Sequence, residues 1–468
     1  MAIKPHYCIY GKLVIPQRYV LCFMIFLAVL ISYTMRVCLH IAIVEIAVPL
    51  RHMQGNLTDP CPDLKESTVD VKGGTYNWTA EQQGHILGAF FPGYVITHLP
   101  GGFLADVIGA KHILGGGLAL SAVFTFLTPV VIKNSEWWGV YIIRFFIGFA
   151  QGPIYPCLST FLSKWVPLRE RTALGAFVNT GNQLGSIIGN LGSSQIMAHI
   201  NWPMVFYFWA ILAAIWYIFF MLTCYSEPTT HPFVTEGEAQ MLHEAIGPKQ
   251  KFKVPWLSIV KDPAVWGLLG GQIGHDVIFF LIVVQLPTYM KNVLKFNIKE
   301  NGVLNSIPYL CLWLSSLVTG VLADYLISKD KISILRIRQI YTFVGNVGPG
   351  ICVVIASYLG CNRIASASMF IIGMLIMGPF YSGMKVNVLD ITKNFAGIIM
   401  AIVNGLGALA YFPVPSVTSM VTKNNTLEEW RIVFWVLLLI CTAVSSAYVL
   451  LTSGERAEWD KVENQESE

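Results

Sequence analysis

The chain has 468 residues, of which 54% are hydrophobic and only 12% charged, and its net charge at pH 7 is +4. A soluble domain needs a more heavily charged exterior, so this composition excludes an ordinary cytosolic enzyme, a disordered chain and a small disulfide-stapled secreted domain. The charges are scattered and form no basic tract of the kind that binds nucleic acid, so no nucleic-acid partner is expected. The solvent of this chain is expected to be membrane lipid.

Twelve apolar stretches are long enough to cross the hydrocarbon core, which takes about 20 residues per helix. They are continuous and lack the ten-residue alternation of barrel strands, so the predicted fold is an all-α membrane protein with twelve transmembrane helices. The predicted spans are 19–49, 82–105, 112–133, 137–161, 171–198, 202–225, 259–289, 301–327, 335–359, 363–388, 393–421 and 429–451. The first span is too long for a cleaved signal peptide and is expected to remain.

The distribution of positive charge predicts the orientation of the chain. With an even number of spans, Lys and Arg are more numerous on the side of the two termini, so both termini are expected to be cytoplasmic. Three Asn-x-Ser/Thr sequences then fall outside, and Asn56, Asn77 and Asn424 are predicted glycosylation acceptors.

The two halves of the chain repeat each other. Each match links one span with the span six places later; the matched positions are 104–106 with 322–324, 182–185 with 404–407, and Trp202 with Trp430. The repeat predicts an N-terminal six-helix half over 1–225, a solvated cytoplasmic linker over 226–258, and a C-terminal half with an acidic tail over 259–468. Parallel repeats of this kind place a substrate site near the middle of the membrane.

The sequence resembles the major facilitator superfamily, first in the loop after span 2, where residues 101–111 resemble that superfamily's loop 2–3 motif. Other stretches resemble the anion/cation symporter family, which contains sialin, the vesicular glutamate transporters and the sodium-dependent phosphate cotransporters. These stretches are 36–44, 90–94, 144–148, 163–171, 286–290, 307–310, 382–391 and 396–397. The resemblance implies the major facilitator fold, alternating access, co-transport of Na⁺ or H⁺, no cofactor, and a monomer in lipid.

Ionisable residues within the predicted spans are the first candidates for a substrate site, because each costs about 2.5–3.5 kcal/mol at mid-membrane on insertion scales. Arg36 and His40 share one face of span 1, and Arg144, Gln151 and Tyr155 share one face of span 4. Two cations in one cavity suit a small anionic substrate, and the arginine fork suits carboxylate or phosphate. The alternative is that Arg144 bonds neighbouring carboxylates or carbonyls and only holds helices together.

Further polar residues lie in the later spans. Asn182 and Asn404 occupy matched positions in spans 5 and 11, where they either contact substrate or join helices. His275 in span 7 is a candidate substrate contact, and the adjacent Asp276 a candidate coupling residue. Lys385 in span 10 is expected to extend toward the cytoplasm.

The loop 2–3 motif supplies the predicted gating residues. Asp106 with Lys111 is interpreted as a conformational latch, and Asp324 with Lys329 as its counterpart in the second half. The alternative is a solvated turn. The ten cysteines include no CxxC pair, so no metal site is predicted. In span 5, the glycines of the 181–189 segment predict a small-residue packing face.

Departures from the family pattern bear on the substrate and on coupling. Gln151 stands where proton-coupled members carry a titratable Glu, and His275 stands where the glutamate carriers have Arg. The prediction is therefore a symporter of a small anion, inorganic phosphate with sodium, in the plasma membrane in preference to a lysosomal or vesicular one. A proton-coupled or facilitative carrier of sialate, acidic amino acids or urate stays open, as does a non-transporting receptor on the same fold.

Overall fold

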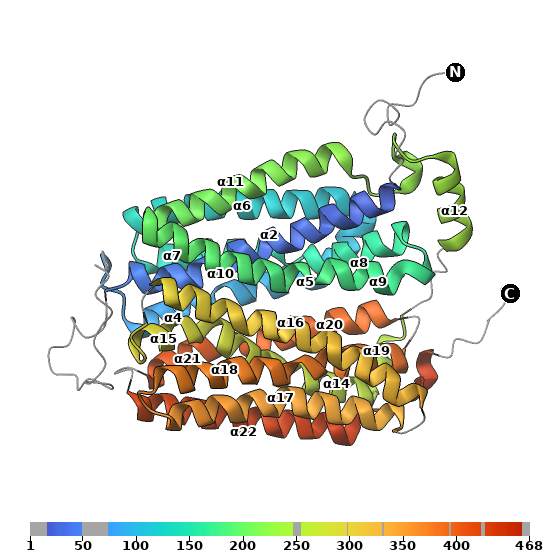
Figure 1. The fold of residues 1–468 in the computed structure, drawn as a ribbon. Coiled ribbons are helices and arrows are strands. Elements are labelled where there is room, and N and C mark those ends of the chain that lie inside the picture. Colours follow the sequence, from blue (N-terminus) through green and yellow to red (C-terminus); the bar gives the residue numbers. More distant parts are fainter. Residues whose placement is uncertain are drawn as a thin grey trace. The chain divides into compact units, whose positions relative to one another are not determined.

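The computed structural model describes residues 16–48, 74–246, 254–296, 298–329, 332–392, 395–422 and 426–460. These residues are helical almost throughout, and within them the extended pairing is limited to a single bridge between Ala47 and Tyr76. Figure 1 shows the helices in chain order. The predicted all-α class is confirmed.

The longer helices follow the predicted spans closely. In chain order they are α2 (Gln17–Ile46), α4 (Ala80–Gly88), α5 (Phe90–Leu104), α6 (Ala110–Asn134), α7 (Trp137–Gln151), α8 (Ile154–Trp165), α9 (Leu168–Asn179), α10 (Gly181–His199), α11 (Trp202–Thr223), α12 (Glu236–Ile246), α13 (Trp256–Lys261), α14 (Pro263–Phe280), α15 (Leu286–Asn292), α16 (Ile298–Ser328), α17 (Ile334–Tyr358), α18 (Arg363–Met377), α19 (Met384–Ile391), α20 (Ala396–Tyr411), α21 (Val414–Val421) and α22 (Leu427–Leu451).

Ten helical stretches among the described residues are long and apolar enough to cross a membrane. The predicted spans 82–105 and 171–198 are not among the ten. Each is divided into two shorter helices, α4 with α5 and α9 with α10, and the second pair also carries many polar side chains.

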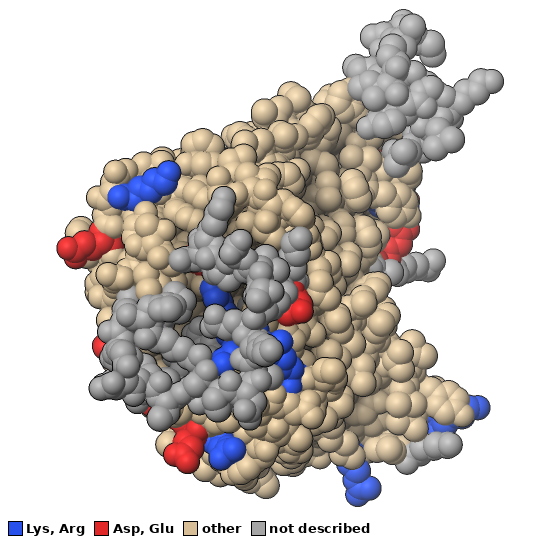
Figure 2. All heavy atoms as spheres, turned by 60° about the vertical axis from the view of Figure 1, so that its left-hand side comes forward, with Lys and Arg blue, Asp and Glu red and all other residues tan. Residues whose placement is uncertain are grey.

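The exterior of several helices is apolar, as a lipid solvent requires. On α16, Val318 is 66% exposed and Val321 is 73% exposed. Figure 2 shows one face on which charged residues are few and most of the described surface is uncharged. In water such a surface would aggregate, whereas in a bilayer it meets lipid chains.

The described helices group into two compact units. The first comprises Met1–Arg36, Pro92–Gly189 and Pro203–Lys251, and α6 packs against α7 and α8 in it. The second comprises Val37–Phe91, Asn190–Trp202 and Phe252–Glu468. There α14 packs against α20 and α22, and α17 packs against α18 and α22.

Glycines bring the fifth span close to the first, as the small-residue pattern predicts. An ideal Cβ on Gly181 would lie 2.7 Å from the carbonyl oxygen of Phe26, and one on Gly185 would lie 2.4 Å from that of Leu30. In the second unit, a Cβ on Gly407 would lie 2.5 Å from Oδ2 of Asp276 on α14. Because Gly185 and Gly407 are matched in the repeat, the same approach occurs in both units. This parallel supports the internal duplication.

Two spans are interrupted at corresponding places. Span 4 breaks at residues 152–153, where a Cβ on Gly152 would lie 2.4 Å from the carbonyl oxygen of Tyr94. Span 10 breaks at a 3-10 turn over Gly378–Tyr381. Interrupted helices in transporters free backbone and side-chain groups for a binding site, so these breaks direct attention to the residues around them.

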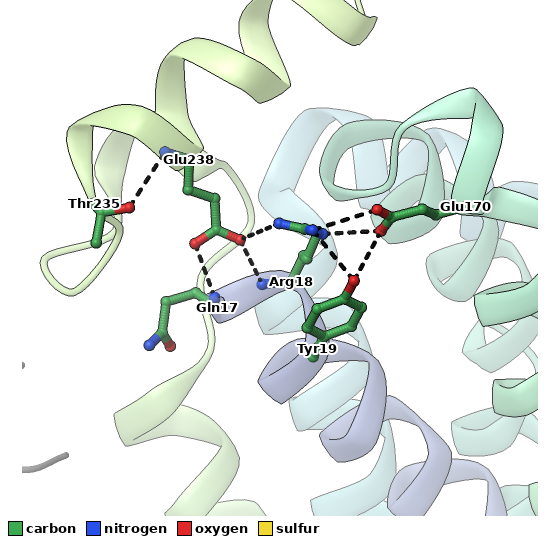
Figure 3. A network of polar contacts seen from close by, with 6 residues as sticks. All are labelled: Gln17, Arg18, Tyr19, Glu170, Thr235 and Glu238. Atoms are coloured by element: carbon green, nitrogen blue, oxygen red, sulfur yellow. Dashed lines mark hydrogen bonds and ion pairs between the residues drawn. The ribbon is translucent and has the colours of Figure 1, made fainter. Parts of the chain in front are cut away.

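Part of the described linker packs against α2, while other linker residues, such as Glu236 and Glu244, are exposed. Thr235 caps α12 by accepting a hydrogen bond from the backbone N of Glu238, but the Glu238 carboxylate turns away from its own helix (Figure 3). It accepts hydrogen bonds from the backbone N of Gln17 at 2.9 Å and of Arg18 at 3.2 Å, and so caps α2. The Arg18 guanidinium lies between Glu238 and Glu170, at 3.3 and 2.9 Å.

His231 fixes the start of the linker against the C-terminal end of α11. Its Nε2 is 3.0 Å from the carbonyl oxygen of Thr223, and its Nδ1 accepts a hydrogen bond from the backbone N of Phe233. The ring also lies edge-on to Trp165 and Tyr225. Burial lowers the pKa of His231, so its contribution to stability is complete above about pH 6.5 and is lost as the pH falls toward the lowered pKa.

Replacing Gly185 by Ala should destabilise the protein by about 1–3 kcal/mol, because the new methyl group would press on a backbone carbonyl that cannot move aside. The matched control is Gly116→Ala, where no atom lies within 4 Å of the added Cβ. Thermal unfolding of the detergent-solubilised protein measures both. Equal unfolding temperatures for the two variants would contradict the packing assignment.

Replacing Glu238 by Ala should cost about 2–3 kcal/mol, because the substitution removes the cap of α2 together with a charge-assisted bond to Arg18. The control is Glu244→Ala on the same helix, whose carboxylate is exposed and accepts a hydrogen bond from Gln240. The same unfolding measurement applies. A loss below about 0.5 kcal/mol, typical of surface substitutions, would show that the network adds nothing.

Candidate anion-binding site

The two arginines predicted to contact substrate meet within the first unit. Arg36 on α2 is 7% exposed and Arg144 on α7 is 1% exposed. Nη2 of Arg144 donates a hydrogen bond to the backbone carbonyl of Arg36 at 3.2 Å. The fold therefore places the Arg144 guanidinium against the backbone of Arg36, a contact that also fits the alternative in which Arg144 bonds a carbonyl and joins helices.

Tyrosines surround the Arg36 guanidinium. Its central carbon lies 5.3 Å from the ring centroid of Tyr33 and 5.3 Å from that of Tyr94. The hydroxyls of Tyr33 and Tyr155 are 3.3 Å apart, which joins the predicted Tyr155 to the same group. Aromatic faces stabilise a cation, by about 0.5–2 kcal/mol, without cancelling its charge. A guanidinium held in this way can still attract an anion.

Gln151 serves as a helix contact in the structure. Its Nε2 donates to Oγ of Ser121 on α6 at 2.8 Å and approaches the carbonyl oxygen of Ser32 on α2 at 3.4 Å. The side chain therefore joins α7 to both neighbours. Its position directly before the break in span 4 ties that break to α2 and α6.

Asn182 offers an acceptor beside the tyrosines. Its Oδ1 is buried and has no hydrogen-bond partner among the described residues, and its amide lies within reach of the Tyr155 hydroxyl. A protonated oxygen of a substrate could satisfy this acceptor. Asn182 thus fits the substrate-contact alternative, and its neighbour Gly185 supplies the helix contact.

The polar candidates of the second unit gather in one place. We call Gln272, His275, Asp276, Lys385 and Asn404 the C-terminal polar cluster. Nε2 of Gln272 donates to Oδ1 of Asp276 at 2.8 Å, and Nζ of Lys385 donates to Oδ1 of Asn404 at 2.5 Å. The expectation that Lys385 extends toward the cytoplasm is wrong, because an amide acceptor on the neighbouring helix holds its ammonium group within the unit.

Two histidines occupy buried positions. His40 lies one turn beyond Arg36 on α2 and is 4% exposed. The His275 ring stacks on Phe380 with centroids 3.8 Å apart and on Phe279 at 5.4 Å. Stacking fixes the plane of His275, and its Nδ1 has no hydrogen-bond partner among the described residues. The ring is thus positioned to contact a ligand.

The predicted latch residues differ in their contacts. The ammonium group of Lys111 lies 3.9 Å from the ring centroid of Tyr225, at the start of the linker. The backbone of Asp106 lies in a π-helical turn, and its side chain is outside the described part of the structure. Asp324 and Lys329 are exposed, and no ion pair involving either is present among the described residues.

Of the three predicted glycosylation acceptors, Asn77 is exposed just before α4. Asn56 and Asn424 lie outside the described residues.

Sequence reasoning did not select Tyr33, Tyr94 or Gln272. Tyr33 precedes Arg36 by three residues and therefore shares its helical face, a signal that was available. Gln272 precedes Asp276 by four residues on α14, so the same signal was available for it. Tyr94 reaches Arg36 through packing, and its own position in the sequence gives no comparable indication.

Comparison with known proteins supports the geometry. The sequence pattern of the Major Facilitator Superfamily matches residues 21–415. A Drosophila ananassae protein named "Putative inorganic phosphate cotransporter" is 36% identical over 449 residues, covering 93% of each chain. Human sialin is 32% identical over 451 residues, covering 94% of this chain and 90% of sialin.

A solved structure supports the fold. A bacterial homologue of the human lysosomal transporter Spinster, in an inward-facing and occupied conformation, matches with a TM-score of 0.69. The match covers 93% of this chain and 97% of that one at 11% sequence identity, so it supports the fold alone. The chain is thus an integral, multi-pass membrane transporter and not an enzyme. It belongs to the major facilitator superfamily and, within it, to the family that contains inorganic phosphate cotransporters, sialin and vesicular glutamate transporters.

Proposed function

We propose that this protein is a secondary active symporter that moves inorganic phosphate together with sodium by alternating access. The observation that carries the proposal is the meeting of Arg36 and Arg144 in the first unit, with the Arg36 guanidinium between tyrosine rings. The proposed location is the plasma membrane, with both termini cytoplasmic and with glycosylated outer loops.

Phosphate suits the donors of this site. Each guanidinium presents up to five N–H groups in a planar fork, and phosphate offers oxygens on several sides, whereas a monocarboxylate offers two. Asn182 can accept a hydrogen bond from a protonated phosphate oxygen. The Drosophila relative, whose name refers to phosphate, is consistent with this substrate.

Sodium is favoured over the proton because of Gln151. An amide does not titrate, so this position cannot carry a proton through the cycle. In this structure Gln151 instead joins three helices. The sodium gradient would then drive the uptake of the phosphate anion. We leave the sodium-binding site unassigned.

The electrostatics of the arginine pair suggest how substrate binding promotes transport. A buried cation that loses contact with water is costly unless a counter-charge accompanies it. When an anion neutralises Arg36 and Arg144, the cost of closing the site falls. The break in span 4 at residues 152–153 lies a little more than two helical turns beyond Arg144 and gives that span a point at which to adjust.

Replacing Arg144 by Lys should lower sodium-driven phosphate uptake into liposomes by about tenfold or more, because a point charge cannot reproduce the two-pronged contact of a guanidinium. The control is Arg336→Lys, since Arg336 is exposed. Size-exclusion chromatography verifies that both variants fold. Wild-type uptake by the folded Arg144→Lys variant would refute the assignment.

The choice of substrate and ion is tested with the unaltered protein. Labelled phosphate, sialate, glutamate and urate are supplied separately, each with an imposed sodium gradient or an imposed proton gradient. We expect phosphate uptake that requires sodium. Uptake of an organic anion driven by protons alone would favour the second candidate, for which the adjacent buried His275 and Asp276 are the supporting observation. Binding without any uptake would favour a receptor.

A further inference from the structure

Lys385 is an intramembrane cation that the proposed function has not used. It lies at the start of α19, directly after the break in span 10, and its side chain is partly buried. Its Nζ is 2.5 Å from Oδ1 of Asn404 on α20 and 5.9 Å from the ring centroid of Phe380. A weaker contact reaches the sulfur of Met400 at 3.9 Å.

The direction of this side chain needs a reason. A lysine in a span usually reduces its cost by extending its long stem toward the membrane surface. Here the ammonium group is instead held by a neutral amide. An ammonium group has three donors, and the described residues offer Lys385 one good acceptor and one weak sulfur acceptor. Its capacity for further hydrogen bonds suits an incoming anion.

Asp276 balances the charge of Lys385 from a fixed position. The carboxylate accepts a hydrogen bond from Gln272, and its Oδ2 lies 2.5 Å from the position that a Cβ on Gly407 would take. Asp276 is close enough to Lys385 to interact with it electrostatically. The cluster is therefore near neutral when empty, and the ammonium group can exchange the Asn404 amide for a better acceptor.

We propose that Lys385 is a specificity-determining residue that binds an oxygen of the transported anion, and that Asn404 is the positioning residue that holds the ammonium group when no anion is present. This inference rests on the proposed function and extends it to the second unit. A compact ammonium group in the second unit favours an oxyanion that carries two negative charges, such as the phosphate dianion, over a singly charged carboxylate.

The test compares Lys385→Gln and Lys385→Arg with the control Lys261→Gln, since Lys261 is exposed on α13. We expect Lys385→Gln to raise the KM for phosphate about tenfold, because it loses a charge-assisted hydrogen bond, and to change the KM of a transported monocarboxylate much less. Lys385→Arg should stay within about threefold of the wild type, since the charge remains. An unchanged KM for phosphate in Lys385→Gln overturns the proposal.

Removing Lys385 alone leaves Asp276 without its counter-charge, so the double variant Lys385→Gln with Asp276→Asn is measured as well. Both substitutions together keep the cluster neutral. Binding is followed by the rise in unfolding temperature that phosphate produces in the detergent-solubilised protein. A rise that persists undiminished in the folded double variant overturns the proposal.

This binding measurement separates the inference from the proposed function. If phosphate stabilises the wild type but not the Lys385→Gln variants, and yet no sodium-driven uptake occurs, the inference stands and the proposed function fails. If uptake depends on Arg144 but is unaffected by Lys385→Gln, the inference fails and the proposed function stands.

Discussion

The cost of burying a charge within the membrane governs the functional part of this molecule. Arg36 and Arg144 are buried within helices that face lipid and protein, where a cation is costly unless polar or aromatic groups stabilise it. The structure supplies tyrosine faces and a backbone carbonyl, which lower the cost of burial without removing the positive charge.

The two units use similar devices at matched positions. A glycine of span 5 lets the helix approach span 1, and its repeat mate in span 11 approaches span 7. Spans 4 and 10 are both interrupted, and the residues around each interruption contact an asparagine of the following span. The two units differ in the charged and polar side chains that they carry. The first unit carries guanidinium groups and tyrosines, while the second carries an ammonium group, a carboxylate and a stacked imidazole. Duplication thus explains the scaffold, and later divergence explains the charges.

Much of the fold could be predicted from hydropathy, because lipid allows few solutions for an apolar stretch of about 20 residues. Helix breaks within spans 2 and 5 were less visible, since they depend on local packing around small residues. Arg36 and Arg144 could be selected as candidate site residues from the free-energy cost of placing a charge within the membrane. The direction of Lys385 could not be predicted, because a long flexible stem permits an exit to the surface or a bond inside, and the choice depends on Asn404, a neighbour brought by folding. The role of Glu238 was not visible for a related reason, because its carboxylate accepts a hydrogen bond from a backbone donor that lies 221 positions earlier in the chain.

That long separation has a consequence for biosynthesis. The N-terminal end of α2 emerges from the ribosome early, but the residue that satisfies its first backbone donors is made only after the whole N-terminal half. At about 5–20 residues per second, the wait is roughly 10–45 s. During that interval the first backbone N–H groups of α2 lack their carboxylate acceptor, and they gain it only when Glu238 has been synthesised.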